Sequence, residues 1–193
     1  WRTVPGQDAY KRYFGKFTQS TNQKVGRHFF SWFFKHLNID YFTLDIDSTI
    51  MTRYGKQEGA KKGYNPKKKD RLSHHPIIAF VNEVKMVANF WLRSGDSSSA
   101  NNFVGFLAET LSNFGDKTVG LIRLDSGFCQ KEVLDYLEQN TLDYIVTAKF
   151  THPIQHLIYS YQAWVSVDDG IEICSKTYKT YNSKQERRIV IVR

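Results

Sequence analysis

The stretch YFTLDIDST, Tyr41–Thr49, predicts a β-strand whose two faces differ in chemistry. Side chains alternate in direction along a strand, so the apolar residues share one face and the two acidic residues, Asp45 and Asp47, share the other. Carboxylates inside a domain are costly unless a cation, a metal ion or several hydrogen-bond donors accompany them. The strand therefore predicts a functional site on its acidic face.

A second stretch, VGLIRLDSGF at Val119–Phe128, supplies a matching carboxylate. An apolar strand ends on Asp125, and Ser126 and Gly127 lead into a predicted helix. The plainest role for Asp125 is to cap that helix, but capping leaves a pair of acidic strands unexplained. Two strands that each deliver a carboxylate suit divalent metal ions, which prefer oxygen ligands and can stabilise the attacking and leaving oxygens of phosphoryl transfer.

Positive charge is concentrated in one segment of the chain. The 193 residues carry a net charge of +8, which indicates an anionic partner. Arg53–Arg71 alone holds eight cations and two acids, or +6. Its three glycines and one proline predict a long loop rather than a regular element. A solvated loop is the simpler interpretation, but the concentration of charge favours phosphate binding.

The histidines and cysteines do not predict a metal site. His74 and His75 are adjacent, and adjacent residues of an extended chain point to opposite faces, so we expect structural or phosphate-contacting roles. Cys129 and Cys174 fit neither a disulfide framework nor a zinc spacing. No apolar run is long enough for a membrane span, and no signal peptide opens the chain.

The periodicity of the chain predicts a mixed α/β fold in three regions. We expect residues 1–40 to be helical. The aromatic run His28–Leu37 within them indicates a buried helix or, alternatively, a platform on which nucleic acid bases stack. Residues 41–150 predict the order β-β-β-α-β-α-β. Residues 151–193 predict short strands, and hence the start of a β-rich insertion.

That element order, with acids at those positions, resembles the ribonuclease H-like catalytic core. Four stretches are also similar to the DDE-type insertion-sequence transposases, and within them to the IS-thirteen-eighty group. They are LDIDST at 44–49, GKQEGAKKGYNPKKKDRLSHHP at 55–76, LRSGDSSSANN at 92–102 and RLDSGF at 123–128. The resemblance covers essentially the whole chain.

The resemblance implies metal-dependent DNA cleavage and strand transfer on a mixed sheet whose first strand lies beside the fourth. Asp47 and Asp125 match the first two acids of the triad, which would hold two Mg²⁺ ions, with Mn²⁺ as an alternative. Asp45, on the same face as Asp47, is either a weaker ligand candidate or a group that supports the ligands without touching the metal.

The family's third acid is a glutamate on a helix after the insertion, and we expect it to lie outside this chain. Glu172 falls in a predicted strand and Glu186 in a basic turn, so neither matches. We therefore expect residues 1–193 alone to be inactive. Without that helix we also expect exposed apolar surface near Ile46 and Leu124.

The implied partner is DNA at transposon ends and at the target, bound by a homodimer in the bacterial cytoplasm, at the nucleoid. The DNA phosphates would be held by cations of the basic segment, namely Arg53, Lys56, Lys61, Lys62, Lys67, Lys68, Lys69 and Arg71. Two alternatives stay open, a nuclease on the same core and a non-catalytic DNA-binding remnant of a transposase.

Overall fold

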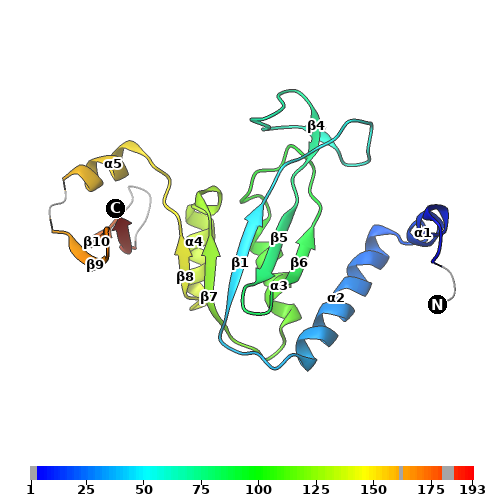
Figure 1. Cartoon of the computed structure of the whole chain (residues 1–193), viewed down its shortest axis with the longest axis horizontal. Helices are drawn as coiled ribbons and strands as arrows, with labels where there is room; N and C mark the ends of the chain where they lie inside the picture. Colours follow the sequence, from blue (N-terminus) through cyan, green and yellow to red (C-terminus); the bar gives the residue numbers. More distant parts are fainter. Residues whose placement is uncertain (1–3, 161–162, 180–184) are drawn as a thin grey trace.

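A mixed five-stranded sheet forms the centre of the computed structural model, which describes residues 4–160, 163–179 and 185–193 (Figure 1). Its strands, in spatial order, are β6 (Met86–Trp91), β5 (Ile77–Val81), β1 (Phe42–Ser48), β7 (Val119–Leu124) and β8 (Tyr144–Val146). β1 runs antiparallel to β5 and parallel to β7. The mixed α/β class and the pairing of the first predicted strand with the fourth are confirmed.

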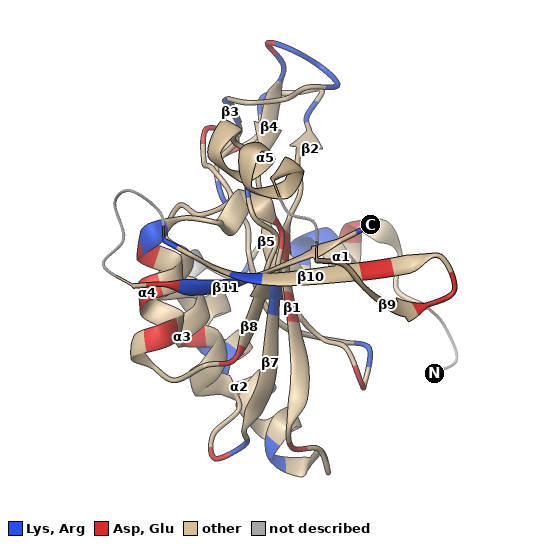
Figure 2. Cartoon of the chain, turned by 90° about the vertical axis from the view of Figure 1, so that its left-hand side faces the viewer, with Lys and Arg blue, Asp and Glu red and all other residues tan. Residues whose placement is uncertain are grey.

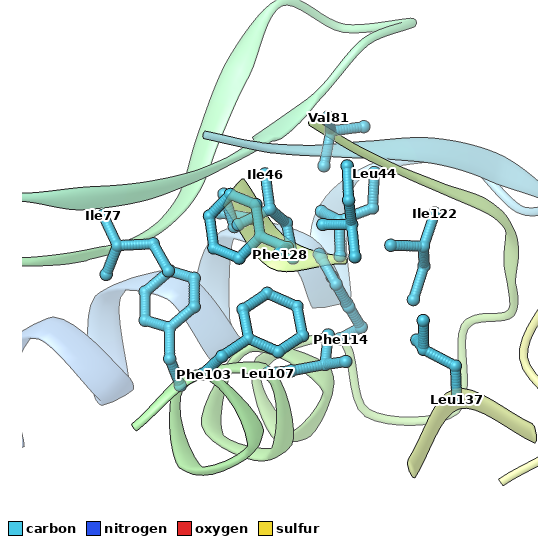
Figure 3. Packing of buried hydrophobic residues seen from close by; sticks show 14 of the residues in the cluster. Leu44, Ile46, Ile77, Val81, Phe103, Leu107, Phe114, Ile122, Phe128 and Leu137 are labelled. Atoms are coloured by element: carbon cyan, nitrogen blue, oxygen red, sulfur yellow. The ribbon is translucent and has the colours of Figure 1, made fainter. Parts of the chain in front are cut away.

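One face of this sheet is covered by helices and forms the hydrophobic core. The helices are α2 (Gln19–His36), α3 (Phe103–Asn113) and α4 (Lys131–Gln139). Figure 3 shows Leu44 and Ile46 of β1 facing Phe103 and Leu107 of α3, and all four are buried. The alternation that defined the apolar face of β1 therefore decides which side of the sheet the helices cover.

The N-terminal region is helical, as expected, but its aromatic run is only partly buried. α1 (Gln7–Phe14) precedes α2, whose first turn is capped by Thr18. Phe34 is completely buried against the core, whereas Phe29 and Trp32 are 54% and 61% exposed. The prediction of a buried helix is wrong for one side of α2, because only one stripe of a helix can face a single sheet layer.

The basic segment is not the structureless loop that its composition predicts. It contributes β3 (Lys61–Lys62) to a second sheet with β2 (Met51–Thr52) and β4 (Leu72–His74), in the order β2-β4-β3. Buried Asn65 fixes the intervening turn, since its amide donates to Thr52 Oγ1 at 2.9 Å and its Oδ1 accepts from the Lys68 amide at 3.0 Å. Such short strands give no periodic signal, so composition alone misses them.

The C-terminal region contains the short strands that the sequence predicts. After α5 (His152–Tyr159), β9 (Val165–Asp168), β10 (Ile171–Tyr178) and β11 (Arg187–Val192) form a three-stranded antiparallel sheet. This sheet lies beyond β8, at one edge of the central sheet (Figure 1). Among the described residues, no helix has both the length and the apolar character that a membrane crossing requires.

The exposed apolar surface of the core lies elsewhere than predicted. Ile46 and Leu124 are only 2% and 5% exposed, because they lie on the face that the helices cover. On the opposite face, the strand registers place Phe90 in line with Asp47, and Ile145 beside Arg123. Phe90 and Ile145 are 45% and 59% exposed, so the open side of the sheet is the one that carries the acids.

Candidate metal centre

Asp47 and Asp125 lie at the same end of two adjacent parallel strands. Ile46 of β1 is paired with Leu124, the last residue of β7, and the two aspartates are the residues that follow them in the chain. Because neighbouring strands lie about 4.8 Å apart, the backbones of the two aspartates are neighbours at this end of the sheet. Both aspartates are exposed, on the face opposite the core.

Each of these carboxylates is oriented through one oxygen only. Asp47 Oδ1 accepts a hydrogen bond from the Ser48 amide at 2.6 Å, and Asp125 Oδ1 accepts one from the Gly127 amide at 2.9 Å. The second bond caps the 3₁₀ turn η1 (Ser126–Phe128), so Asp125 is an N-cap as well as a ligand candidate. Within the described part of the chain, no hydrogen bond or ion pair engages Oδ2 of either aspartate.

The glycine after Asp125 allows the turn to close around its carboxylate. A Cβ atom at Gly127 would lie 3.0 Å from Asp125 Oδ1 and 2.8 Å from Ser99 Oγ. Both distances are shorter than normal contacts, so any larger residue would push the carboxylate or Ser99 away. The glycine of the sequence DSGF is thus a packing requirement of the site.

Asp45 is neutralised by a cation on the neighbouring strand. Arg123, its register partner on β7, donates to it through Nε at 2.5 Å and through Nη2 at 2.6 Å. This bidentate contact raises the pKa of Arg123. Asp45 therefore lies on the same face as Asp47 with its charge balanced by Arg123.

The carboxylates of Asp47 and Asp125 are the right type of ligand for a divalent metal ion, but two ligands are too few to fill its coordination shell. Hard cations such as Mg²⁺ bind carboxylate oxygens and keep several waters when few protein ligands converge. The described residues include no cluster of three or more histidines, cysteines, aspartates or glutamates able to hold a metal. Of the two glutamates that the sequence offers and that do not match the third acid, Glu172 is ion-paired with Arg193 at 2.7 Å and Glu186 lies directly before β11.

The adjacent histidines point to different partners, as predicted, and both are buried. His74 Nδ1 accepts from Arg53 Nε at 2.9 Å, so its Nε2 carries the proton and donates to the Glu58 carbonyl at 2.9 Å. His75 contacts Ser48 Oγ through Nε2 at 3.1 Å. Sequence reasoning missed this contact, although the SHHP block was visible, because only the fold brings residues 48 and 75 together.

The basic segment projects beyond the end of β1 at which Asp47 lies (Figure 1). In Figure 2, which colours Lys and Arg residues blue, blue stretches of the backbone lie around β2, β3 and β4. Three of its cations have partners: Arg53 bonds to His74, Lys61 to Asp96 at 3.1 Å, and Lys68 to the Tyr54 hydroxyl. The remaining cations are exposed, namely Lys56, Lys62, Lys67, Lys69 and Arg71.

Fold and site together define a mixed α/β domain with paired carboxylates at adjacent strand ends, beside a basic projection. A family model, Transposase DDE domain group 1, matches residues 2–193. The chain therefore belongs to the DDE transposase domain family. No curated protein matches the sequence.

Solved transposases are similar to the chain at low sequence identity. In a synaptic complex of piggyBac transposase with hairpin DNA, the match covers 80% of this chain and 33% of the piggyBac chain, at 14% identity and a TM-score of 0.46. In a Mos1 mariner paired-end complex with Mn, the match covers 72% of this chain and 46% of the Mos1 chain, at 14% identity and a TM-score of 0.41. In the catalytic domain of Mos1 mariner transposase, the match covers 83% of this chain and 78% of the Mos1 domain, at 11% identity and a TM-score of 0.38. The chain thus spans about a third of the piggyBac chain and about half of the Mos1 chain in the paired-end complex.

Proposed function

We propose that this chain is part of the catalytic domain of a DNA transposase that cleaves and joins DNA at transposon ends. The observation that carries the proposal is the placement of Asp47 and Asp125 at the same end of paired parallel strands, in a chain of the DDE transposase family. The resemblance to insertion-sequence transposases, including the IS-thirteen-eighty group, supports a homodimer acting in the bacterial cytoplasm.

Asp47 and Asp125 are the metal ligands in this proposal, each through its Oδ2. The bound metals, Mg²⁺ or Mn²⁺, would stabilise the charge on the oxygens that attack and leave the phosphorus atom. The amides of Ser48 and Gly127 hold the carboxylates by their other oxygens. Asp45 keeps Arg123 on the same face, where the guanidinium limits the net negative charge around the two ligands.

Five exposed cations of the basic segment, Lys56, Lys62, Lys67, Lys69 and Arg71, are proposed to hold the DNA backbone. Their position beyond the end of β1 would lay phosphates across the same end of the sheet as the carboxylates. Lys61 and Lys68, which are also exposed, would join them at the cost of surface contacts with Asp96 and Tyr54. Arg53 contributes by fixing His74 instead.

A titration with Mn²⁺ tests the metal site. Binding is measured as the loss of the electron paramagnetic resonance signal of the free ion. We expect Asp47→Asn and Asp125→Asn each to weaken binding at least about tenfold, because each removes one of two charged ligands. Asp116→Asn, at an exposed acid before the start of β7, is the matched control. Equal binding by all three variants and the parent would refute the metal site.

A cleavage assay with Mg²⁺ or Mn²⁺ on DNA carrying the ends of the parent element tests the reaction. We expect residues 1–193 alone not to cut, since two carboxylates leave a two-metal site incompletely neutralised. Cutting that Asp125→Asn abolishes would show instead that residues 1–193 contain a complete site. DNA binding without metal binding would favour a non-catalytic remnant.

A further inference from the structure

The segment between β6 and α3 contacts both acidic strand ends through a single side chain. Ser99 Oγ is hydrogen-bonded to Ser48 Oγ at 2.8 Å, and Ser48 is the residue after Asp47. Ser99 also packs against Gly127, where an added Cβ would lie 2.8 Å from its Oγ and 3.0 Å from its Cβ. Ser99 therefore lies between the chain that follows Asp47 and the turn that Asp125 caps.

His75 holds this arrangement from the side of the SHHP block. Its Nδ1 donates to the Ser97 carbonyl at 2.5 Å, because a carbonyl oxygen can only accept, and its Nε2 contacts Ser48 Oγ at 3.1 Å. His75 is 7% exposed, so water cannot readily replace either contact. One imidazole thus links the segment that carries Ser99 to the residue that Ser99 touches.

Arg93 fixes the main chain on either side of Ser99. Its Nη1 donates to the Ser99 carbonyl at 3.0 Å and to the Asn101 carbonyl at 2.8 Å. Its Nε donates to the His75 carbonyl at 3.0 Å. A half-buried guanidinium that uses its donors on three carbonyl groups holds an irregular segment in one conformation.

We propose that Ser99 is a positioning residue that sets the distance between Asp47 and Asp125, that His75 holds Ser48 against it, and that Arg93 holds the main chain at Ser99. The inference rests on the proposed function in one respect, that the two aspartates are metal ligands. Loss of the Ser99 hydroxyl would free Ser48, and with it the amide that orients Asp47. A larger side chain would displace Gly127 and the amide that orients Asp125.

Amide hydrogen exchange tests this positioning role without any metal. The amides of Ser48 and Gly127 donate to the two carboxylates, so their exchange rates report directly on how firmly the carboxylates are held. We expect Ser99→Ala to accelerate exchange at the Ser48 amide about fivefold, because the hydrogen bond that it removes is of order 1 kcal/mol. Ser98→Ala, at the exposed neighbouring serine, should change neither rate.

Mn²⁺ affinity is the second readout, and two variants of His75 make it specific. The amide nitrogen of Asn replaces Nδ1, so His75→Asn keeps the Ser97 bond and loses the Ser48 contact. Gln places its amide near the position of Nε2, so His75→Gln keeps the Ser48 contact and loses the Ser97 bond. We expect Ser99→Ala and His75→Asn to weaken Mn²⁺ binding about tenfold, as residues that orient metal ligands do, and His75→Gln to weaken it less than about threefold.

The outcomes separate this inference from the proposed function. If both aspartate variants weaken Mn²⁺ binding but Ser99→Ala behaves like Ser98→Ala in both measurements, the positioning role is refuted and the function stands. If neither aspartate variant changes Mn²⁺ binding, the proposed function fails, and amide exchange alone decides whether Ser99 holds the chain that follows Asp47. Equal losses in His75→Asn and His75→Gln would indicate a general packing role and overturn the specific one.

Discussion

At the scale of single residues, Asp125 combines two roles that are usually alternatives. One oxygen caps the 3₁₀ turn through the Gly127 amide, and the other is open. The cap requires only an acceptor oxygen, whereas a metal ligand also requires negative charge. Because the two requirements differ, conservative substitutions can separate them.

Asp125→Asn should keep the cap and lose the ligand, while Asp125→Ala should lose both. We expect urea denaturation to show little change in the free energy of unfolding for Asn and a loss of about 1 kcal/mol for Ala. Mn²⁺ titration should show the same weakened binding for both variants. A loss of stability in Asn equal to that in Ala would mean that the cap depends on charge.

Arg123 should oppose metal binding while contributing little to stability. Its ion pair with Asp45 is at a partly exposed position, with side-chain exposures of 47% and 32%, so Arg123→Gln should change the free energy of unfolding by less than about 1 kcal/mol. Removing a positive charge beside the carboxylates and releasing Asp45 should strengthen Mn²⁺ binding roughly three- to tenfold. Lys85→Gln, in the β5–β6 turn at the other end of the sheet, is the control. Weaker Mn²⁺ binding would show that Arg123 supports the site.

At the scale of elements, the basic segment depends on a close crossing of two chain segments. A Cβ atom at Gly63 would lie 1.9 Å from the Gly95 carbonyl oxygen. A Cβ atom at Gly95 would lie 2.4 Å from the Lys61 carbonyl oxygen. These neighbours are backbone atoms, so they cannot move aside as a flexible side chain would. The glycines therefore set how the β2-β4-β3 sheet packs on the segment that carries Ser99.

Gly63→Ala should disrupt this sheet, and Gly55→Ala should not. A Cβ atom at Gly55 meets nothing within 4 Å, which makes it a matched control in the same segment. We expect trypsin to cleave within residues 53–71 about tenfold faster in Gly63→Ala, because local unfolding frees the backbone beside the exposed lysines to enter the protease active site. Equal cleavage of the two variants would mean that the crossing does not hold the segment.

The basic segment should also dominate the salt dependence of DNA binding. If about four of its cations contact phosphates, the slope of log K against log salt should be near −3.6, from about 0.9 per contact. Replacing Lys67, Lys68 and Lys69 by Ala should flatten the slope by about two to three units. Fluorescence anisotropy of labelled duplex DNA across a salt series measures it. An unchanged slope would mean that these lysines are only a solvated face.

At the scale of the whole molecule, one cluster of charges joins the C-terminal sheet to the core. Arg187 of β11 contacts Asp135 of α4 at 2.9 Å and Glu138 at 2.7 Å, and Tyr144 of β8 donates to Glu138 at 2.7 Å. Arg187 is 13% exposed, so these are well-shielded contacts. They fix the sheet of β9, β10 and β11 against the edge of the core.

Arg187→Met should loosen this junction and remove part of the pH dependence of stability. We expect the free energy of unfolding at pH 7 to fall by about 1 to 2 kcal/mol, because charged hydrogen bonds are lost from a shielded position. Arg188→Met, which removes an exposed contact with Ser175, is the control. An equal effect of the two variants would assign the loss to β11 rather than to the junction.

The sign of the pH dependence follows from the shifted groups. The hydrogen bond from Lys131, with further help from Arg187, lowers the pKa of Asp135. Burial alone would raise the pKa of Glu138, but the bonds from Arg187 and Tyr144 lower it. Asp135 and Glu138 therefore contribute fully to stability above the ordinary carboxyl pKa of about 4. Their contribution is lost as the pH falls through the lower pKa values that they have in the folded protein. Burial and Glu138 raise the pKa of Tyr144 to about 12, so its contribution is lost as the pH rises from about 10 towards 12.

Denaturation midpoints measured between pH 2 and pH 7 test this sign. Stability of the parent should decrease towards acid, and Arg187→Met should flatten that decrease, since Asp135 and Glu138 then lose the cation that holds their pKa values low. A decrease of the same size in both proteins would show that other carboxylates control acid stability.

The sequence by itself determined the strands of the core and the ends at which its acids lie. Period-two alternation in β1 separates Leu44 and Ile46 from Asp45 and Asp47, and this local property survives in the fold because only one face of the sheet is covered. The glycine that follows α3 also has a local cause, since Gly115 takes a positive φ of 67° at the helix end.

Only the tertiary structure decided what surrounds those acids. The contacts of Ser99 with Ser48 and Gly127, and of His75 with Ser48, join segments far apart in the chain. β3 of the basic segment and the strands β2 and β4 that flank the segment are two or three residues long, so they leave no periodic pattern, and their packing depends on the crossing at Gly63 and Gly95. Hydrophobic periodicity reports which side of an element is covered, whereas polar partners are selected by distance in the folded chain. For that reason the acids could be predicted, and the residues that hold them could not.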